Sequence, residues 1–228
     1  MNLMNYRMLT LRVLFCFVAA CDAPPSASND AATVIATDDA LTASAAAEQT
    51  LDSIIAEHWD YSLEESPTFA TSVGVSDYND RMPGVAAADQ QRRLQAGQSF
   101  LARVRDIDIG ALGVAGRINA DIFQWVLEDA IGELELNLSR IPFNTFSGFF
   151  MEALYASSNV SMKSVVDYED YIARMSQIPR YFDENLENMR QGVADGFVLP
   201  QIVIDGVSPT IDAQVKDDPE DSSFFEPF

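Results

Sequence analysis

The chain has 228 residues, of which 14 are Lys or Arg and 35 are Asp or Glu, and its formal net charge at pH 7 is −21. So acidic a surface repels phosphate backbones and anionic lipid headgroups, and we therefore expect no nucleic-acid partner. The two cysteines are Cys16 and Cys21. Because we expect Cys16 to be removed with a leader, no internal disulfide can form, and stability must come from a hydrophobic core.

Residues 1–20 have the features of a secretory signal peptide. Arg7 and Arg12 precede a short apolar run at residues 13–20, which is too short to span a bilayer as a helix of about 20 residues. The run ends in Val18-Ala19-Ala20-Cys21, which resembles a lipobox, where the cysteine is acylated before the peptidase cuts ahead of it. The sequence therefore predicts lipidation at Cys21 and a lipoprotein anchored in the cell envelope, facing the periplasm or the exterior. The alternative is an ordinary secretory signal with an incidental cysteine.

The segment that follows, residues 21–47, consists mainly of Ala, Ser, Thr, Asp and Pro. With hardly a large apolar side chain, it cannot offset the entropy lost on ordering. We therefore predict a flexible tether there, followed by a helical domain at residues 48–208.

Helical spacing of apolar residues defines the first half of this domain. A first helix ends before Pro67, and the next two cover residues 86–105 and 115–138. The side chains expected on their apolar faces are Leu51, Ile54, Ile55, His58, Trp59 and Ser62 in the first, Leu94, Leu101 and Val104 in the second, and Ile118, Ile122, Trp125 and Val126 in the third.

The second half begins with residues 142–155, which are aromatic and lack a clean period, so we expect a buried, irregular crossing. Two helices follow at 165–175 and 179–194. The second carries Phe182, Leu186, Met189 and Val193 on one side, and Gly196 suits the position just past its end. Residues 202–204 fit either a strand or a helix opened by Pro200.

Residues 209–228 form an acidic tail that ends in three phenylalanines, Phe224, Phe225 and Phe228, with nothing obvious to bury them. Exposed aromatic clusters usually await a partner. We therefore expect the protein to continue beyond Phe228, and the fold to be an all-α, multi-helix array or bundle that is a fragment of a larger helical protein.

Several polar positions carry a functional and a structural interpretation. His58 fits a metal ligand or a base, but better a partly buried structural histidine. The loop with Asp77, Asn79, Asp80 and Gly84 lacks the closing Glu of a calcium loop. Ser147 before Gly148 lacks the frame of a serine nucleophile and is better explained as a turn. For the carboxylates Asp167, Glu169 and Asp170, an acidic helix start is simpler than an acid–base pair. A supporting polar network is expected from Asn119, Asp121, Asn144 and Arg174.

Several segments, in order, resemble the domain-of-unknown-function family 885. They are Pro67-Thr68-Phe69-Ala70-Thr71 with Gly74, Asp80-Arg81-Met82-Pro83, Arg117-Ile118-Asn119-Ala120-Asp121, Pro142-Phe143-Asn144 with Ser147-Gly148, and the run 166–174. The resemblance spans about residues 48–208. It implies a mostly α-helical protein, often a lipoprotein, whose longer relatives are similar to zinc peptidases through a His-Glu-Gly-x-Pro-Gly-His motif that holds the metal and activates water.

That metal motif is missing from this chain, whose only histidine is His58. We therefore expect no catalytic, cofactor-binding or metal-binding residue in the chain itself. The first hypothesis is the amino-terminal portion of a cell-envelope, metal-dependent, peptidase-like hydrolase that acts on peptide substrates. The alternative is a non-catalytic envelope lipoprotein that binds peptides or protein partners.

Overall fold

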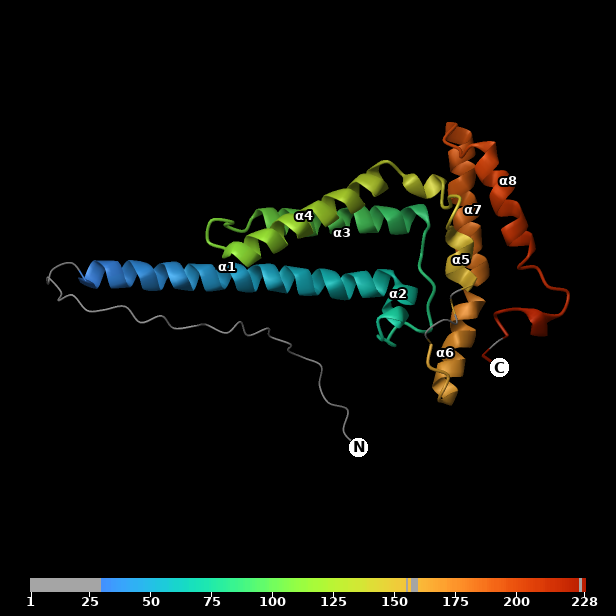
Figure 1. The fold of residues 1–228 in the computed structure, drawn as a ribbon, viewed down its shortest axis with the longest axis horizontal. Coiled ribbons are helices and arrows are strands. Elements are labelled where there is room, and N and C mark those ends of the chain that lie inside the picture. The colour runs from blue at the N-terminus through green and yellow to red at the C-terminus, as the bar shows by residue number, and fades with distance from the viewer. Residues whose placement is uncertain (1–29, 155, 157–159, 226) are drawn as a thin grey trace, which may run out of the picture. The chain divides into compact units, whose positions relative to one another are not determined.

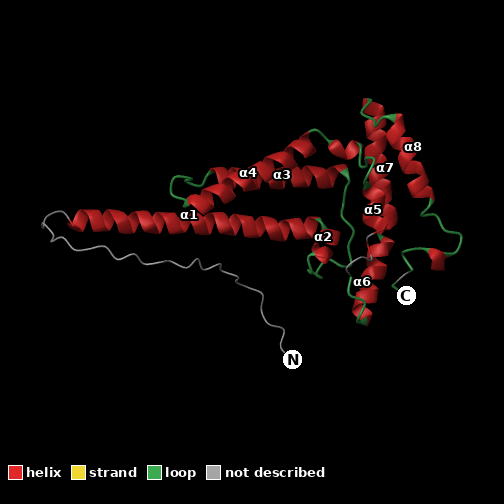
Figure 2. Ribbon diagram, in the orientation of Figure 1, coloured by secondary structure: helices red, strands yellow, loops and turns green. Residues whose placement is uncertain are grey.

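In the computed structural model, all the regular secondary structure of the described residues is helical (Figure 2). The described residues are 30–154, 156, 160–225 and 227–228. The chain divides into two compact units, residues 1–39 and residues 40–228, and the architecture below is that of the second unit. The predicted all-α class is confirmed.

Helix α1 (Asp30–Glu65) begins within the segment that was predicted to be a flexible tether. The prediction counted the missing large apolar side chains and neglected alanine, which has the highest intrinsic helix propensity. Ala47 also packs against the core, which fixes the helix at this residue. The residues before Ala47 continue the same helix toward the N-terminus. The end of α1 at Glu65 agrees with the predicted stop before Pro67, which is the first residue of the short α2 (Pro67–Ser72). The proposed signal peptide and Cys21 lie outside the described residues.

A first hydrophobic cluster joins α1, α3 (Ala87–Arg105) and α4 (Val114–Glu135), which lie side by side (Figure 1). Its fully buried members include Leu51 from α1, Val104 from α3 and Leu127 from α4, each exposed by 1% or less. Burial of each such side chain stabilises the fold by about 1.5–3 kcal/mol. At Gly97, an added Cβ would lie 3.2 Å from Cγ1 of Ile131, so this glycine permits the close approach of α3 and α4.

The predicted buried face of α4 was wrong. Ile118, Ile122 and Trp125 are more than half exposed, and the buried side chains come from the opposite face. They are Gly116, Ala120, Phe123, Leu127 and Ile131. Both faces are apolar, and the buried one is the face with small residues near its start. Gly116 leaves room there for the carboxylate of Glu48, which accepts a hydrogen bond from the N–H of Gly113 at 2.8 Å.

A second hydrophobic cluster lies around the last helices. Helices α5 (Phe149–Leu154), α6 (Val165–Ser176) and α7 (Ile178–Asp195) surround it, and its buried members are Met82, Ala156, Tyr171 and Tyr181. Gly196 ends α7 with a φ of 72°, as its sequence position predicted. Residues 202–204 belong to α8 (Gln201–Asp212), so the helix opened by Pro200 is the correct alternative. Two short 3₁₀ turns, Leu138–Arg140 (η1) and Pro219–Asp221 (η3), complete the elements.

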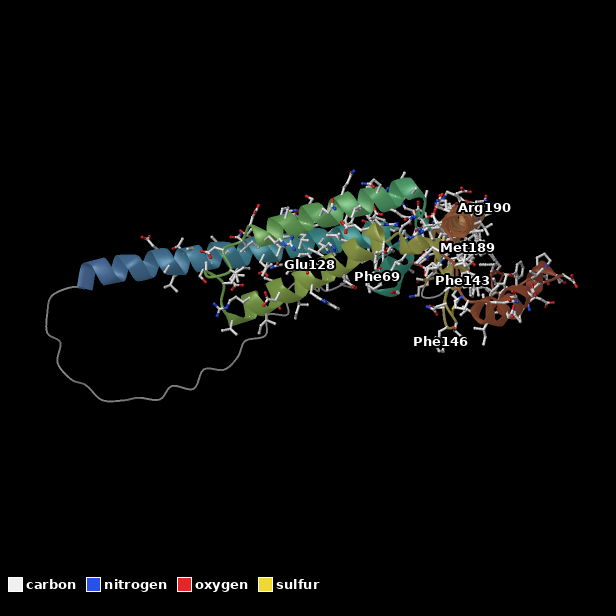
Figure 3. All side chains as sticks on the ribbon, turned by 90° about the horizontal axis from the view of Figure 1, so that it is seen from above. Phe69, Glu128, Phe143, Phe146, Met189 and Arg190 are labelled. Carbon is white, nitrogen blue, oxygen red and sulfur yellow. The ribbon has the colours of Figure 1, made fainter. Side chains whose placement is uncertain are left out.

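The aromatic segment at residues 142–155 is only partly the buried crossing that was predicted. Its second half forms α5, in which Phe150 is buried, whereas the loop before it projects Phe146 into solvent with 91% of its surface exposed (Figure 3). The terminal phenylalanines Phe225 and Phe228 are exposed, as expected, at 41% and 56%, but the end of the chain does contact α6. The hydroxyl of Tyr171 donates to the carbonyl of Phe224 at 3.0 Å, and the ring of Phe228 packs against Tyr168 and Tyr171.

Candidate functional site

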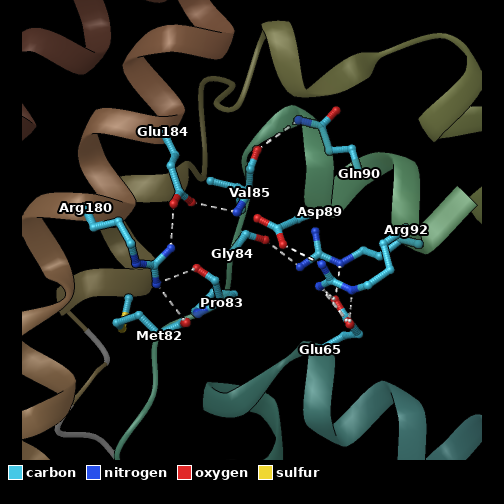
Figure 4. A network of polar contacts seen from close by, with 11 residues as sticks. Glu65, Met82, Pro83, Gly84, Val85, Asp89, Gln90, Arg92, Arg180 and Glu184 are labelled. Atoms are coloured by element: carbon cyan, nitrogen blue, oxygen red, sulfur yellow. Dashed lines mark hydrogen bonds and ion pairs between the residues drawn. The ribbon is translucent and has the colours of Figure 1, made fainter.

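The loop of residues 78–85 lies along α6 and α7, and side chains of these helices satisfy its backbone. Gln177 donates to the carbonyl of Asp80 at 2.7 Å and accepts from the N–H of Met82 at 3.3 Å. One and two turns further along, Arg180 donates to the carbonyls of Met82 and Pro83, at 3.1 and 3.3 Å, and Glu184 accepts from the N–H of Val85 at 2.8 Å. Figure 4 shows Arg180 and Glu184 against this loop. The loop is therefore fixed without any strand pairing.

Arg174 anchors the start of the same loop from a position with no solvent exposure. Its guanidinium donates to the carbonyls of Ala156 and Tyr78, at 3.1 and 3.0 Å, and to the hydroxyl oxygen of Thr71 at 2.8 Å. Burial lowers the pKa of Arg174 from its ordinary value, and its Nε has no hydrogen-bond partner. An arginine that is buried and whose two terminal nitrogens donate to acceptors of the chain itself has a structural role.

Ion pairs connect the other side of the loop to α1 and α3. Both Arg92 and Arg93 reach the carboxylate of Glu65 at 2.8 Å, and Arg93 also donates to the carbonyl of Gly84 (Figure 4). Hydrogen bonds that Arg92 donates to the carboxylates of Asp89 and Glu65 raise the pKa of Arg92 above its usual range. The loop is thus held from both sides, and it positions the first turns of α3 opposite α7.

A groove of about 610 Å³ lies between these two helices. The first turns of α3 form one wall, α7 forms the other, and the end of α4 closes one side. The residues that line it are Ala86, Ala87, Gln90, Gln91, Leu94, Leu134, Asn137, Asp183, Glu184, Glu187, Asn188 and Gln191. Hollows of this size are typical of small-molecule and peptide sites.

Hydrogen bonds between amide side chains connect the two walls of the groove. The amide of Gln90 donates to the side-chain oxygen of Asn188 at 3.2 Å, and both residues donate to the carbonyl of Val85. Ser139 donates to the amide oxygen of Gln90 at 2.7 Å. Asn188 is 9% exposed, so this chain of bonds is a rigid, internally satisfied part of the groove.

The carboxylates of the groove follow one edge of α7. Asp183, Glu187 and Gln191 are spaced by four residues and therefore lie on one face of the helix, and all three are exposed. Glu187 pairs with Arg190 at 3.2 Å on the surface, and Asp183 has no ion-pair partner among the described residues. Across the groove, Leu94 and Leu134 add apolar surface. The combination suits a ligand that carries a positive group next to a small apolar one.

None of the residues that line this groove was predicted from the sequence to have a functional role, and Leu94 was expected only on an apolar helix face. A signal in the sequence is the polar series Gln177, Glu184, Asn188 and Gln191, which recurs at helical spacing on the face opposite to the expected apolar side of α7. The predicted apolar side of α7 is only partly buried: Phe182 packs against the second cluster, whereas Leu186 and Val193 are exposed. The buried face includes the polar Asn185 and Asn188.

His58 is the partly buried structural histidine that the sequence favoured. Its ring packs edge-on against Phe100 and Phe123, with both centroids 5.1 Å away, and its Nδ1 lies 3.4 Å from the hydroxyl of Ser62. Burial lowers the pKa of His58. Apolar rings on both sides leave no room for a set of carboxylate or imidazole ligands around this nitrogen.

The other polar motifs have local structural roles. Asn79 is buried and accepts a hydrogen bond from Thr71 at 2.7 Å, which removes it from any calcium loop. Ser147 belongs to a turn in which Asn144 accepts from its N–H at 3.0 Å. Asp167 forms a capping box with Ser164, and backbone hydrogen bonds from Lys163 and Ser164 lower the pKa of Asp167. The simple explanation of an acidic helix start is confirmed for Asp167.

The polar network expected from Asn119, Asp121, Asn144 and Arg174 does not form, because the first three side chains are exposed and only Arg174 is buried. These polar side chains were expected to be buried because their neighbours in the sequence are apolar. On α4, however, an apolar neighbour can face solvent, so sequence context did not predict burial.

The described residues do not fit the zinc site that the family resemblance implies. Within them, no three His, Cys, Asp or Glu side chains are grouped closely enough to hold a metal ion, and the only histidine is enclosed by aromatic rings. We therefore derive no chemical step through a metal. A search of the same residues for a helix long and apolar enough to cross a membrane also finds none.

The fold and the groove together define an all-helical protein with a concave groove that is lined by amide and carboxylate side chains. Residues 67–228 match the family model described as "Bacterial protein of unknown function (DUF885)". The chain belongs to this family, as its sequence motifs predicted. The match starts later and ends later than the expected span of 48–208, so it leaves out α1 and includes the acidic tail. No curated protein and no solved structure matches the chain.

Proposed function

We propose that this chain is the peptide-binding helical portion of a cell-envelope lipoprotein related to peptidase-like hydrolases. The observation that carries the proposal is the groove between α3 and α7, where exposed carboxylates and apolar side chains lie next to a base of hydrogen-bonded amides. The carboxylates of Asp183 and Glu187 would bind the ammonium group of a peptide N-terminus, since charge-assisted hydrogen bonds are the stronger ones. Leu94 and Leu134 would receive the adjoining side chain.

Any hydrolysis would need catalytic groups besides those described. The side chains that line the groove carry carboxylate, amide and alkyl groups. The carboxylate of Glu184 already accepts hydrogen bonds from Arg180 and from the N–H of Val85. In this proposal the chain holds and orients the peptide, and a zinc-binding motif of the kind that the family resemblance implies would supply the chemistry. Attachment to the envelope would come from lipid on Cys21, which with more than one acyl chain gives stable membrane anchoring.

The test measures the affinity of the full chain for a short peptide with a free N-terminus, Ala-Leu-Ala-Ala amide, by titration calorimetry. We expect saturable binding that N-acetylation of the peptide weakens by about tenfold, which corresponds to about 1.4 kcal/mol. The double variant Asp183→Asn, Glu187→Gln should lose affinity by a similar factor. Glu169→Gln, an exposed carboxylate on α6, is the matched control and should bind as the unaltered chain does.

Equal binding of the free and the acetylated peptide would contradict a role for the two carboxylates. Equal loss in the Glu169→Gln control would show that only the overall acidity of the protein matters. Either result removes the groove as the site.

A further inference from the structure

The outward face of α4 carries a row of apolar side chains that nothing in the described fold covers. We call this row the outward stripe, and it consists of Val114, Ile118, Ile122, Trp125 and Val126. Trp125 is 65% exposed and Ile122 is 56% exposed. Because residues three and four apart share a helix face, these side chains form one continuous strip. Strips of this kind on a soluble surface mark interaction sites.

The outward stripe takes no part in the core that α4 forms with α1 and α3. The opposite face of α4 already packs against α1 and α3 through Phe123, Leu127 and Ile131. The groove between α3 and α7 takes only Leu134 from α4, and that residue lies on the inward side. An interaction through the stripe is therefore independent of peptide binding in the groove and goes beyond it.

Carboxylates without partners lie beside the stripe and beyond its end: Asp121 flanks it, and Asp129 and Glu133 follow on the same face toward the C-terminal end of α4. Asp121, Asp129 and Glu133 are exposed, and none of them forms an ion pair or side-chain hydrogen bond with another described residue. Glu128, by contrast, is paired with Arg105 at 2.7 Å. The chain as a whole carries a net charge of −21. A partner that covers the apolar row must therefore approach three uncompensated negative charges.

This charge pattern selects among the possible occupants. A second copy of the chain would bring the same carboxylates against themselves, and an anionic membrane would be repelled in the same way. A helix with an apolar face, and with Lys or Arg along one edge and at one end, would match both features, since complementary charges give specificity and fast association. Its apolar residues would pack around Trp125, and aromatic side chains of this kind are common anchors of interfaces.

We propose that the outward stripe of α4 docks a basic amphipathic helix of another protein. The two helices would pack side by side, with the apolar face of the partner on Ile118, Ile122 and Trp125. Its basic residues would lie against Asp121, Asp129 and Glu133. In this mode of recognition an amphipathic helix binds an apolar surface through apolar side chains that recur at helical spacing.

The experiment uses a synthetic Leu and Lys peptide of about 20 residues in a heptad pattern, which as a helix extends over about 30 Å, close to the length of α4. Its counterpart has Glu in place of every Lys. The full chain contains two tryptophans, so Trp59→Phe leaves Trp125 as the only indole reporter. We expect saturable binding of the Lys peptide with a blue shift of the Trp125 emission, and no shift with the Glu peptide.

Two sets of variants test the two components of the surface. Ile118→Gln with Ile122→Gln should weaken binding of the Lys peptide by about tenfold or more. Val165→Gln with Val166→Gln, at exposed apolar positions of α6, is the matched control and should leave the affinity unchanged.

Neutralising the three carboxylates with Asp121→Asn, Asp129→Asn and Glu133→Gln should also weaken binding of the Lys peptide, and should reduce its dependence on salt. All substituted side chains are exposed, and circular dichroism checks that the helical content is retained.

Four outcomes would overturn the proposal. The first is equal binding of both peptides, and the second is equal loss in the α6 control. The third is a concentration-dependent dimer in sedimentation that Ile118→Gln with Ile122→Gln abolishes, because the occupant would then be a second copy. The fourth is the same Trp125 shift on vesicles of phosphatidylglycerol and phosphatidylethanolamine, which would assign the stripe to a lipid surface.

Discussion

Replacing Arg174 by Met is the sharpest perturbation of the loop that positions the groove. The substitution keeps an unbranched side chain but removes hydrogen bonds to Ala156, Tyr78 and Thr71. The carbonyl of Tyr78 keeps a second bond from the N–H of Arg81, whereas the carbonyl of Ala156 loses the bond from the guanidinium. A buried acceptor without a partner costs about 1–3 kcal/mol, and a hydrogen bond to a charged group contributes about 1.5–3 kcal/mol.

Removing the guanidinium also relieves its own desolvation, which offsets part of this loss. The expected decrease in the free energy of unfolding is therefore about 2–3 kcal/mol. Urea titration of the full chain, followed by circular dichroism, measures it. Arg105→Met is the matched control, because Arg105 pairs with Glu128 on the surface, where ion pairs contribute about 0–1 kcal/mol. A decrease for Arg174→Met no larger than that for Arg105→Met would refute the structural role of the buried arginine.

Three further predictions test the core, a titrating group and the anchor. Leu127→Ala should destabilise by about 2–5 kcal/mol, whereas Ile122→Ala on the opposite face of α4 should stay within about 0.5 kcal/mol of the unaltered chain; the reverse order in urea titrations would mean that the buried face is misassigned. Burial lowers the pKa of His58 below its ordinary value of 6.5, so the unfolded chain binds this proton more readily, and stability should fall as the pH drops from about 7 toward 5. His58→Gln should make the urea midpoint less dependent on pH over that window. An unchanged pH dependence would exclude His58 as its cause. Cys21→Ser should move the exported protein from the membrane fraction to the soluble fraction, and retention on the membrane would contradict lipid anchoring.

The longer helices α3, α4, α6 and α7 followed from local sequence signals, whereas the short α2 and α5 did not. Proline at the start of α2 and Gly196 beyond α7 set boundaries that the structure has at the same places, because proline fixes φ and glycine tolerates the left-handed region. The failure came at α1, where low hydrophobicity was taken for the absence of structure. An alanine-rich extension needs little packing once an adjoining segment is fixed in a helix.

Burial was harder to predict than helicity. On α4 two apolar faces compete, and the choice between Ile122 and Phe123 depends on which neighbour is there to cover it. On α7 the polar Asn188 is buried because the carbonyl of Val85, far away in sequence, accepts its hydrogen bond at 2.8 Å. The groove needed the same long-range information, since its walls come from helices that no local pattern brings together.

Photochemical crosslinking tests the proposed peptide groove most directly. The probe is a short peptide with a free N-terminus and a benzoylphenylalanine at its second position, irradiated with the full chain and mapped by mass spectrometry. Crosslinks on the first turns of α3, at Gln91 or Leu94, are the predicted result, because these residues face the carboxylates of α7 across the groove. Crosslinks confined to the outward stripe of α4, or no site-specific crosslink at all, would contradict peptide binding in the groove.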